Sequence, residues 1–140
     1  MKNPVVHFDL PADDVERAKK FYKKTFGWKF NEYKMPVGES YWMIQTVEVD
    51  KEMMPKEPGA INGGMMKRDK PGQVFMNYVQ VDSIDKMLKT ISANGGAMIQ
   101  PKQEIDKDMG WIAAFKDTEG NIMGLIEMTK AQKDRNKKKK

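Results

Sequence analysis

The sequence contains no cysteine and only one histidine among its 140 residues. The absence of cysteine excludes disulfides, thiolate nucleophiles, zinc ribbons and iron–sulfur ligation by this chain. Imidazole chemistry is restricted to His7, because no other histidine is available to act as a base or as a metal ligand. These two absences narrow the chemistry that the chain can perform before any fold is considered.

Long hydrophobic runs are also absent, since no apolar stretch approaches the roughly 20 residues needed to span a bilayer. The first residues lead directly into a strand-like stretch, without an apolar h-region or a small-residue cleavage site. With 39% hydrophobic and 32% charged residues, the composition is typical of a soluble protein. We therefore expect a cytoplasmic protein with no membrane partner.

The net charge of +5 is concentrated at one end of the chain. Residues 130–140 contain seven of the 25 basic residues and one of the 20 acidic residues, so residues 1–129 contain 18 basic and 19 acidic residues. The C-terminal segment also lacks apolar residues beyond Ala131 and offers nothing to pack. We predict a single domain over residues 1–129, a disordered basic tail over 130–140, and no nucleic-acid partner.

The order of strand, helix and three strands occurs twice along the chain. In the first copy, a helix begins at Asp13 or Asp14 and ends at Gly27, and in the second a helix begins at Ile84 and ends at Gly95-Gly96. The predicted strands cover residues 5–10, 28–33, 41–49 and 61–67 in the first copy, and 75–81, 97–101, 110–116 and 121–128 in the second.

This repeat predicts a fold that contains both helices and strands (α/β in the broad sense) and that belongs to the α+β class. Module one covers residues 3–68 and module two covers residues 73–128. Two βαβββ modules would form a concave mixed sheet with a central cleft, and the helices would lie outside.

Both copies resemble proteins of the vicinal oxygen chelate superfamily, which includes glyoxalases, bleomycin resistance proteins and extradiol dioxygenases. The first copy carries the resemblance in His7-Phe8-Asp9-Leu10-Pro11-Ala12-Asp13-Asp14, Glu16-Arg17-Ala18, Phe21-Tyr22 and Phe26-Gly27-Trp28. The second carries it in Tyr78-Val79-Gln80-Val81-Asp82-Ser83-Ile84-Asp85, Gly95-Gly96 and Phe115-Lys116-Asp117-Thr118-Glu119-Gly120-Asn121, with Thr118 where proline is usual. The resemblance covers about residues 3 to 128 and implies the two-module fold and a homodimer.

The resemblance also implies four positions that hold a divalent metal in the family's enzymes. His7 fills the first position, near the start of the first strand. The other three positions fall on residues that are poor ligands for hard divalent metals, namely Met76 or Asn77, Gly63 or Gly64, and Gly124. We therefore expect no metal cofactor.

A metal site formed by His7 and Glu127 remains an alternative. Glu127 lies three residues from Gly124 and should face the other side of its strand, because strand side chains alternate with a period of two. A β-bulge could reverse this alternation.

The glycines at the former ligand positions predict a ligand site without metal, because they remove side chains from the floor of a cleft. His7 and Asp9, two residues apart on one strand face, are also weak candidates for acid–base catalysis, and a solvated strand-end carboxylate is the favoured interpretation of Asp9. The residues expected to bind the ligand are His7, Trp42, Met66, Met76, Tyr78, Gln80, Trp111 and Gly124. Trp42, Trp111 and the methionines could instead fill the core or an interface.

Two functions follow from these residues. The first is metal-independent binding of a small organic molecule by a glyoxalase/bleomycin-resistance-like protein. The alternative is a metal-dependent glyoxalase- or dioxygenase-like enzyme, such as a lyase, isomerase or oxygenase, acting on a small organic substrate. The sequence leaves open whether the protein is a catalyst and which molecule it binds.

Overall fold

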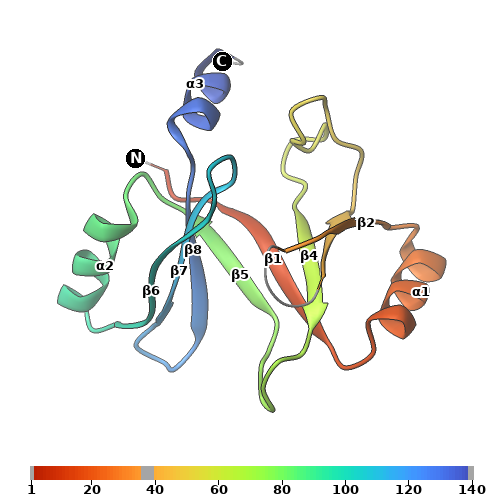
Figure 1. Ribbon diagram of the computed structural model, residues 1–140. Coiled ribbons are helices and arrows are strands. Elements are labelled where there is room, and N and C mark those ends of the chain that lie inside the picture. The colour runs from red at the N-terminus through yellow and green to blue at the C-terminus, as the bar shows by residue number, and fades with distance from the viewer. Residues whose placement is uncertain (1, 36–39, 139–140) are drawn as a thin grey trace. The chain divides into compact units, whose positions relative to one another are not determined.

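The computed structural model describes residues 2–35 and 40–138, with side chains up to residue 134. Eight strands and three helices occur in this part of the chain, and together they form the predicted α+β fold (Figure 1). The strand–helix–three-strand order occurs twice, which confirms the predicted repeat.

The chain separates into two compact units. Val6–Met76 forms the N-terminal unit, and Asn77–Lys140 together with Met1–Val5 forms the C-terminal unit. These limits lie close to those of the predicted modules. That the two modules make up a single domain with a central cleft stays a prediction.

The N-terminal unit contains four strands in the order β2-β3-β4-β1, drawn from red to yellow-green in Figure 1. β1 runs parallel to β4, whereas β2 and β3, and β3 and β4, are antiparallel. The element bounds are β1 (Val5–Ala12), α1 (Val15–Phe26), β2 (Lys29–Tyr33), β3 (Tyr41–Gln45) and β4 (Asn62–Lys67).

Helix α1 begins after Asp14, whose side chain accepts a hydrogen bond from the backbone N–H of Arg17 at 3.0 Å. It ends at Gly27, which adopts a left-handed conformation with φ of 74°. Both limits agree with the sequence prediction. The apolar side of the helix covers one face of the half-sheet, where the buried core consists of Phe8, Ala12, Ile44 and Met65.

The strand alternation places His7 and Asp9 on the opposite face of this half-sheet, because Phe8 and Leu10 point toward the helix core. The face of the N-terminal half-sheet that is turned away from α1 is called the distal face below. The same alternation on neighbouring strands adds Tyr41, Met43, Gly64 and Met66 to the distal face.

The C-terminal unit repeats this plan with the strand order β5-β8-β7-β6. Its elements are β5 (Met76–Gln80), α2 (Ile84–Ala93), β6 (Ala97–Asp106), β7 (Gly110–Lys116), β8 (Ile122–Glu127) and α3 (Lys130–Lys138). Its core under α2 consists of Val81, Ile84, Ala113 and Leu125. Tyr78 and Gly124 therefore lie on the face turned away from α2.

Strand β6 is longer than predicted and extends through Pro101 to Asp106. The sequence prediction ended this strand at residue 101. β6 is the last strand in the order of this half-sheet, and its register with β7 shifts at several points. An edge strand tolerates proline because one side of its backbone needs no ladder partner.

The segment predicted to be a disordered tail contains helix α3, so the prediction differs from the structure here. Thr129 and Gln132 begin the helix by capping each other: the N–H of Gln132 donates to Thr129 Oγ1 at 3.1 Å, and the N–H of Thr129 donates to Gln132 Oε1 at 2.7 Å. The charge and the lack of apolar residues beyond Ala131 suggested disorder and overlooked this capping pair. Residues 139 and 140 of the predicted tail lie outside the described residues.

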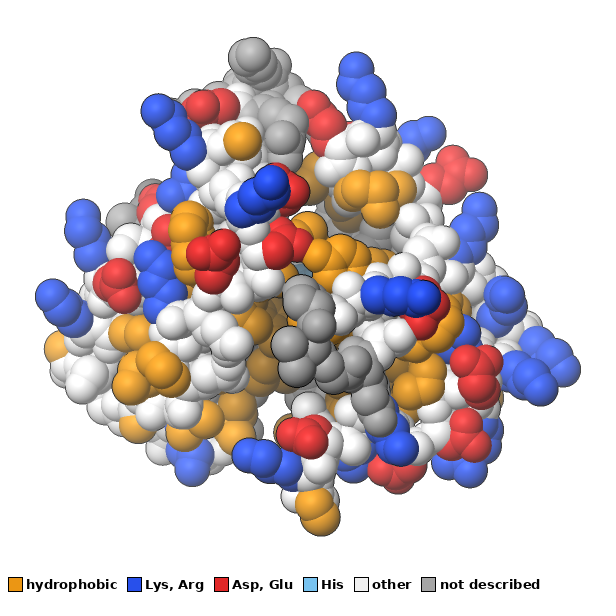
Figure 2. Space-filling model, viewed as in Figure 1, with side chains coloured by type: hydrophobic (Ala, Val, Ile, Leu, Met, Phe, Trp, Pro, Cys, Tyr) orange, Lys and Arg blue, Asp and Glu red, His pale blue; other side chains and the backbone are white. Residues whose placement is uncertain are grey.

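The surface charges do not gather into one basic area on the face shown in Figure 2, where Lys and Arg side chains alternate with Asp and Glu. This mixture agrees with the nearly balanced charge of residues 1–129. No helix in the described part of the chain is both long and apolar enough to cross a membrane.

Candidate functional site

A hydrogen-bonded cluster of three polar side chains lies on the distal face of the N-terminal unit. His7 and Asp9 come from β1, and Tyr41 comes from the start of β3, two strands away in the sheet order. The hydroxyl of Tyr41 lies 2.6 Å from Asp9 Oδ1 and 2.8 Å from His7 Nε2, and His7 Nε2 lies 3.2 Å from the same Asp9 oxygen. We call this the His–Asp–Tyr cluster.

The hydrogen bonds of the cluster define the role of each atom. Tyr41 has one proton, and the 2.6 Å contact shows it donating to Asp9 Oδ1. The Tyr41 oxygen then accepts from His7, so Nε2 of His7 carries a proton. In a neutral imidazole this arrangement leaves Nδ1 as the hydrogen-bond acceptor.

The cluster is partly buried, because the side chains of His7 and Asp9 are 22% and 16% exposed. Polar interactions are stronger in such a place than in bulk water, and a small molecule can still reach the groups. The ring of Tyr41 also lies nearly parallel to the imidazole, at an interplanar angle of 20° with the ring centroids 6.5 Å apart.

Gly64 makes room for Tyr41. A Cβ atom at this position would overlap the hydroxyl and the ring of Tyr41, so any side chain at residue 64 would have to displace the tyrosine. Gly64 is the β4 partner of Asp9 in the β1–β4 register. The space above this glycine is therefore filled by a hydroxyl of the protein itself.

Gly124 makes a matching close contact in the C-terminal unit. It pairs with Tyr78 in the β5–β8 register, and a Cβ atom here would overlap the ring of Tyr78. Tyr78 is only 5% exposed. The expectation that the glycines leave open volume for a ligand is therefore corrected: tyrosine side chains occupy the space above both Gly64 and Gly124.

The two tryptophans predicted to bind the ligand lie on the helix-facing sides of their half-sheets. Trp42 packs against the core under α1, opposite the distal face, and the ammonium of Lys19 lies 3.3 Å from its ring centroid. Trp111 packs against the core under α2, with Lys102 4.8 Å from its ring centroid. The structure does not bring Trp42 to His7, because neighbouring residues of a strand face opposite sides.

The remaining predicted residues lie on faces turned away from the helices. Met66 lies on the distal face with His7 and Asp9, and Met76 and Gln80 share the face of β5 that carries Tyr78. The backbone N–H of Gln80 donates to the carbonyl of Pro4 at 2.9 Å.

Glu127 has a structural role at the start of α2. Its carboxylate Oε1 accepts a hydrogen bond from the backbone N–H of Ile84 at 2.8 Å, and Lys102 Nζ lies 3.7 Å away. The residue points toward the helix side of its half-sheet, as the alternation from Gly124 indicated. This position gives no support to the alternative metal site of His7 and Glu127.

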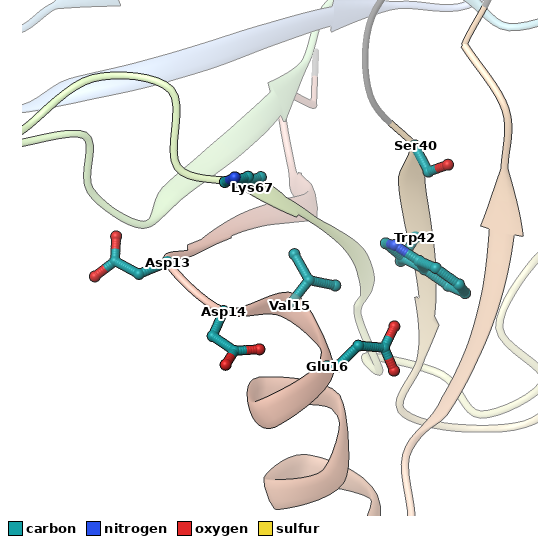
Figure 3. A pocket seen from close by; sticks show the side chains of 7 residues that line it. All are labelled: Asp13, Asp14, Val15, Glu16, Ser40, Trp42 and Lys67. Carbon is teal, nitrogen blue, oxygen red and sulfur yellow. The ribbon is translucent and has the colours of Figure 1, made fainter.

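An acidic hollow of about 460 Å³ lies on the helix side of the N-terminal unit (Figure 3). Figure 3 shows that the carboxylates of Asp13, Asp14 and Glu16 spread apart rather than meeting at one point. Each has a partner within the protein: Asp13 pairs with Arg68, Asp14 caps α1, and Glu16 pairs with Lys19. The hollow is lined by Asp13, Asp14, Val15, Glu16, Ser40, Trp42 and Lys67, and it does not include His7.

Comparisons with known proteins identify the family. Residues 5–46 match the family model described as bleomycin resistance protein-like N-terminal. A glyoxylase-like domain-containing protein of Didymella fabae is 31% identical over 120 residues, which cover 84% of this chain and 88% of that protein. A relative from Mycobacterium bovis that also carries glyoxylase in its name is 29% identical over 119 residues, but the match covers only 42% of its length.

Solved structures show the same fold at low sequence identity. A hypothetical protein of Bacillus halodurans is 14% identical with a TM-score of 0.68, and the alignment covers 93% of this chain and 97% of that one. A methylmalonyl-CoA epimerase of Mycobacterium tuberculosis is 15% identical with a TM-score of 0.64, covering 93% of this chain and 91% of that one. The fold is that of the vicinal oxygen chelate superfamily. Within it, the chain belongs to the glyoxalase and bleomycin-resistance-like proteins.

The residues of this chain do not fit the metal that the family's enzymes hold. His7 Nε2 lies 2.8 Å from the Tyr41 hydroxyl and 3.2 Å from Asp9 Oδ1, so a metal at this nitrogen would have to displace both contacts. Tyr41 and Tyr78 cover Gly64 and Gly124, and the resemblance implied a metal ligand at Gly124 and at Gly63 or Gly64. Among residues 2–35 and 40–138, no group of three or more His, Cys, Asp or Glu side chains is placed to hold a metal ion.

Tyr41 is the residue of the cluster that sequence reasoning missed. The sequence prediction named its neighbour Trp42 instead. A strand alternation counted back from buried Ile44 would have shown that Tyr41, and not Trp42, faces away from the core. This alternation was the available signal.

Proposed function

We propose that this chain binds a small organic molecule without a metal, on the distal face of the N-terminal unit and in contact with the His–Asp–Tyr cluster. The observation that supports this proposal most strongly is the hydroxyl of Tyr41, which lies over Gly64 and is hydrogen-bonded to both His7 and Asp9. At Gly64, where a metal ligand was one of the expectations, the hydroxyl of Tyr41 instead forms part of a polar cluster.

The chemistry of the cluster favours binding over metal catalysis. Three polar groups converge at partly buried positions, a feature typical of the few polar groups that orient a ligand in an otherwise apolar site. Met43 and Met66 share the distal face and are half-buried, which provides adaptable apolar contacts around the cluster.

The proposal can be tested by screening small organic molecules with ligand-observed NMR on protein treated with a chelator. Molecules that bind the wild-type protein should lose about tenfold or more in affinity to His7→Ala, because a residue in contact with the ligand is removed. Trp42→Phe is the matched control on the opposite face of the same half-sheet and should change affinity by less than about twofold.

Two results would contradict the proposal. Hits that are weakened by Trp42→Phe and unaffected by His7→Ala would place the site on the helix side. Binding that appears only after a divalent metal is added back would show that the site depends on metal.

A further inference from the structure

We infer that Asn94, directly after α2, is a site of spontaneous deamidation, and that its conversion destabilises the end of this helix. The sequence contains two Asn-Gly pairs, Asn62-Gly63 and Asn94-Gly95. Asparagine is a thermolabile residue, and a following glycine favours its loss because no side chain shields the glycine nitrogen. The two pairs have different surroundings in the structure, and only Asn94 is placed to react.

Deamidation of Asn94 is a substitution at its side-chain amide. The backbone nitrogen of Gly95 loses its proton and attacks Cγ of Asn94, so that a bond forms between these two atoms and the bond from Cγ to Nδ2 breaks. Nδ2 takes up a proton and leaves as ammonia, and a cyclic succinimide remains. Water then adds to either carbonyl of the ring and opens it, which gives aspartate or isoaspartate at residue 94.

The Asn94-Gly95 pair is exposed to water at the point where α2 has ended. Gly95 adopts a φ of 97°, in the region that glycine favours. Its N–H donates to the carbonyl of Ser92 at 3.4 Å, which is longer than the usual N–H···O distance of about 2.7 to 3.2 Å. An exposed and weakly bonded N–H loses its proton to hydroxide more readily than one in a sheet.

The Asn62-Gly63 pair is fixed inside β4, which lies between β3 and β1. Oδ1 of Asn62 accepts hydrogen bonds from the N–H of Thr46 at 2.7 Å and from the hydroxyl of Thr46 at 2.9 Å. Gly63 is buried and pairs with Phe8 on one side and with Ile44 on the other. Closure of the ring here would break the bonds of the amide and bend a strand that is paired on both sides.

The amide of Asn94 contributes to the end of α2. Its Nδ2 donates to the carbonyl of Thr90 at 2.8 Å, and an aspartate has no N–H for this place. The C-terminus of a helix carries a partial negative charge, and α2 has no basic residue in its last turn to offset a new carboxylate. Conversion to aspartate therefore removes a hydrogen bond and adds an unfavourable charge.

Isoaspartate has a larger effect, because it adds the Cβ atom of residue 94 to the main chain. The turn that follows is tightly packed: the N–H of Gly96 donates to the carbonyl of Ile91 at 2.9 Å. A Cβ atom at Gly96 would lie 2.6 Å from the side chain of Ile91 and 2.9 Å from the carbonyl oxygen of Lys116. A longer chain at residue 94 displaces Gly96 from these contacts.

The site is tested by incubating folded and urea-unfolded protein side by side in warm, mildly alkaline buffer and measuring conversion at each asparagine by peptide mapping and mass spectrometry. In the folded protein we expect Asn94 to react at least about tenfold faster than Asn62, because Asn62 reacts only after β4 opens. In urea the two should react within about threefold of each other, because the structure that separates them is gone. This comparison needs no variant.

The effect on the helix is tested with Asn94→Asp, which supplies one product of the reaction directly. At neutral pH this variant should unfold at a urea concentration lower by about 0.3 M or more. Asn31→Asp is the matched control, since it adds the same charge at an exposed position of β2, away from any helix end. It should leave the midpoint of unfolding within about 0.1 M of the wild-type value.

The other outcomes overturn specific statements. Equal rates at Asn62 and Asn94 in the folded protein, or conversion of Asn94 only in urea, would overturn the assignment of the site. A urea midpoint for Asn94→Asp equal to that of the wild-type protein or of Asn31→Asp would overturn the effect on α2.

Discussion

Tyr41 and Gly64 depend on each other across the β3–β4 pair. The tyrosine hydroxyl can reach both Asp9 and His7 only because residue 64 has no side chain. A carboxylate at residue 64 and a tyrosine at residue 41 would exclude each other. The loss of one of the family's ligand positions and the presence of the cluster thus have the same structural cause.

This dependence predicts strong coupling between substitutions at the two positions. Gly64→Ala should lower the free energy of unfolding by roughly 1 to 3 kcal/mol, because the new methyl group overlaps Tyr41. In a Tyr41→Ala background the same substitution should cost less than about 0.5 kcal/mol, because the space is then empty. Urea unfolding of the two single variants and the double variant measures the coupling.

Gly63 supplies the control for this cycle. A Cβ atom at Gly63 would meet the backbone oxygen and the ring of Phe8, and Tyr41 is not among its near neighbours. Gly63→Ala should therefore destabilise the protein equally with and without Tyr41. Rescue of Gly63→Ala by Tyr41→Ala, or additive effects at Gly64 and Tyr41, would contradict the assigned contact.

Two of the three residues of the cluster could be predicted from the sequence. His7 and Asp9 were found because their spacing of two on a strand places them on one face, which the structure agrees with. Tyr41 and Gly64 act through a contact between strands, and their closeness depends on a register that a single sequence does not show. Trp42 and Trp111 were predicted at the site although they lie on the helix sides, because the alternation of each strand was not counted from its buried residues.

At the level of elements, the beginning of α2 depends on a carboxylate from a distant strand. Glu127 on β8 accepts the backbone N–H of Ile84, which is the first residue of the helix. A helix N-terminus has unpaired N–H groups and a partial positive charge, and a nearly buried carboxylate satisfies both. Ser83 also accepts the N–H of Lys86 at 3.2 Å.

Replacement of Glu127 by Ala should lower the free energy of unfolding by about 1 to 3 kcal/mol, because the N–H of Ile84 would be left buried without its acceptor. Asp85→Ala is the comparison, since Asp85 is exposed and lies 3.7 Å from the same Lys102. That change should cost less than about 0.5 kcal/mol when unfolding is followed in urea. An equal loss of stability in both variants would show that Glu127 stabilises the fold through its contact with Lys102 and not through the helix terminus.

The turn between β7 and β8 is organised by Asp117. The pKa of its carboxyl group lies below the usual value because the backbone N–H and the side chain of Asn121 and the backbone N–H of Glu119 donate to the charged form. Because the folded-state pKa is lowered, the charged carboxylate stabilises the fold at pH values above the ordinary pKa of an aspartate. This stabilisation is lost as the pH falls through the folded-state pKa.

Asp117→Asn should therefore be less stable than the wild-type protein at neutral pH, and the difference should shrink below about pH 4. Urea unfolding at several pH values checks this expectation. Glu119→Gln is the control, because Glu119 contributes its backbone N–H, and not its side chain, to the Asp117 carboxylate at 2.8 Å. A difference for Asp117→Asn that is the same at neutral and acidic pH would show that charge is not its cause.

Most helices and strands could be predicted because their periodicity and end signals are local. The predicted helix limits at Asp14, Gly27 and Ile84 are reproduced by the structure. The exceptions depend on context: β6 continues past Pro101 because it is an edge strand, and α3 forms after the reciprocal capping of Thr129 and Gln132. Composition had favoured disorder for that segment.

For the whole molecule, the two units preserve the plan of the family while differing in their polar content. The N-terminal unit places His7 and Asp9 where the C-terminal unit, counted back from the caps Asp14 and Ser83, has Met76 and Tyr78. The second repeat offers a thioether and a phenol at these positions, and a thioether is a poor ligand for hard divalent metals. A metal-independent function is consistent with this asymmetry.

The single histidine makes one spectroscopic measurement especially informative. A long-range ¹H–¹⁵N spectrum of untagged, uniformly labelled protein contains one imidazole, so His7 needs no assignment. At alkaline pH we predict the neutral tautomer with the proton on Nε2, donated to Tyr41 and Asp9, and no change on addition of equimolar zinc. Two results would contradict a hydrogen-bonded, metal-independent site. One is a proton on Nδ1 in the protein without zinc, and the other is coordination of zinc by Nε2 when zinc is added.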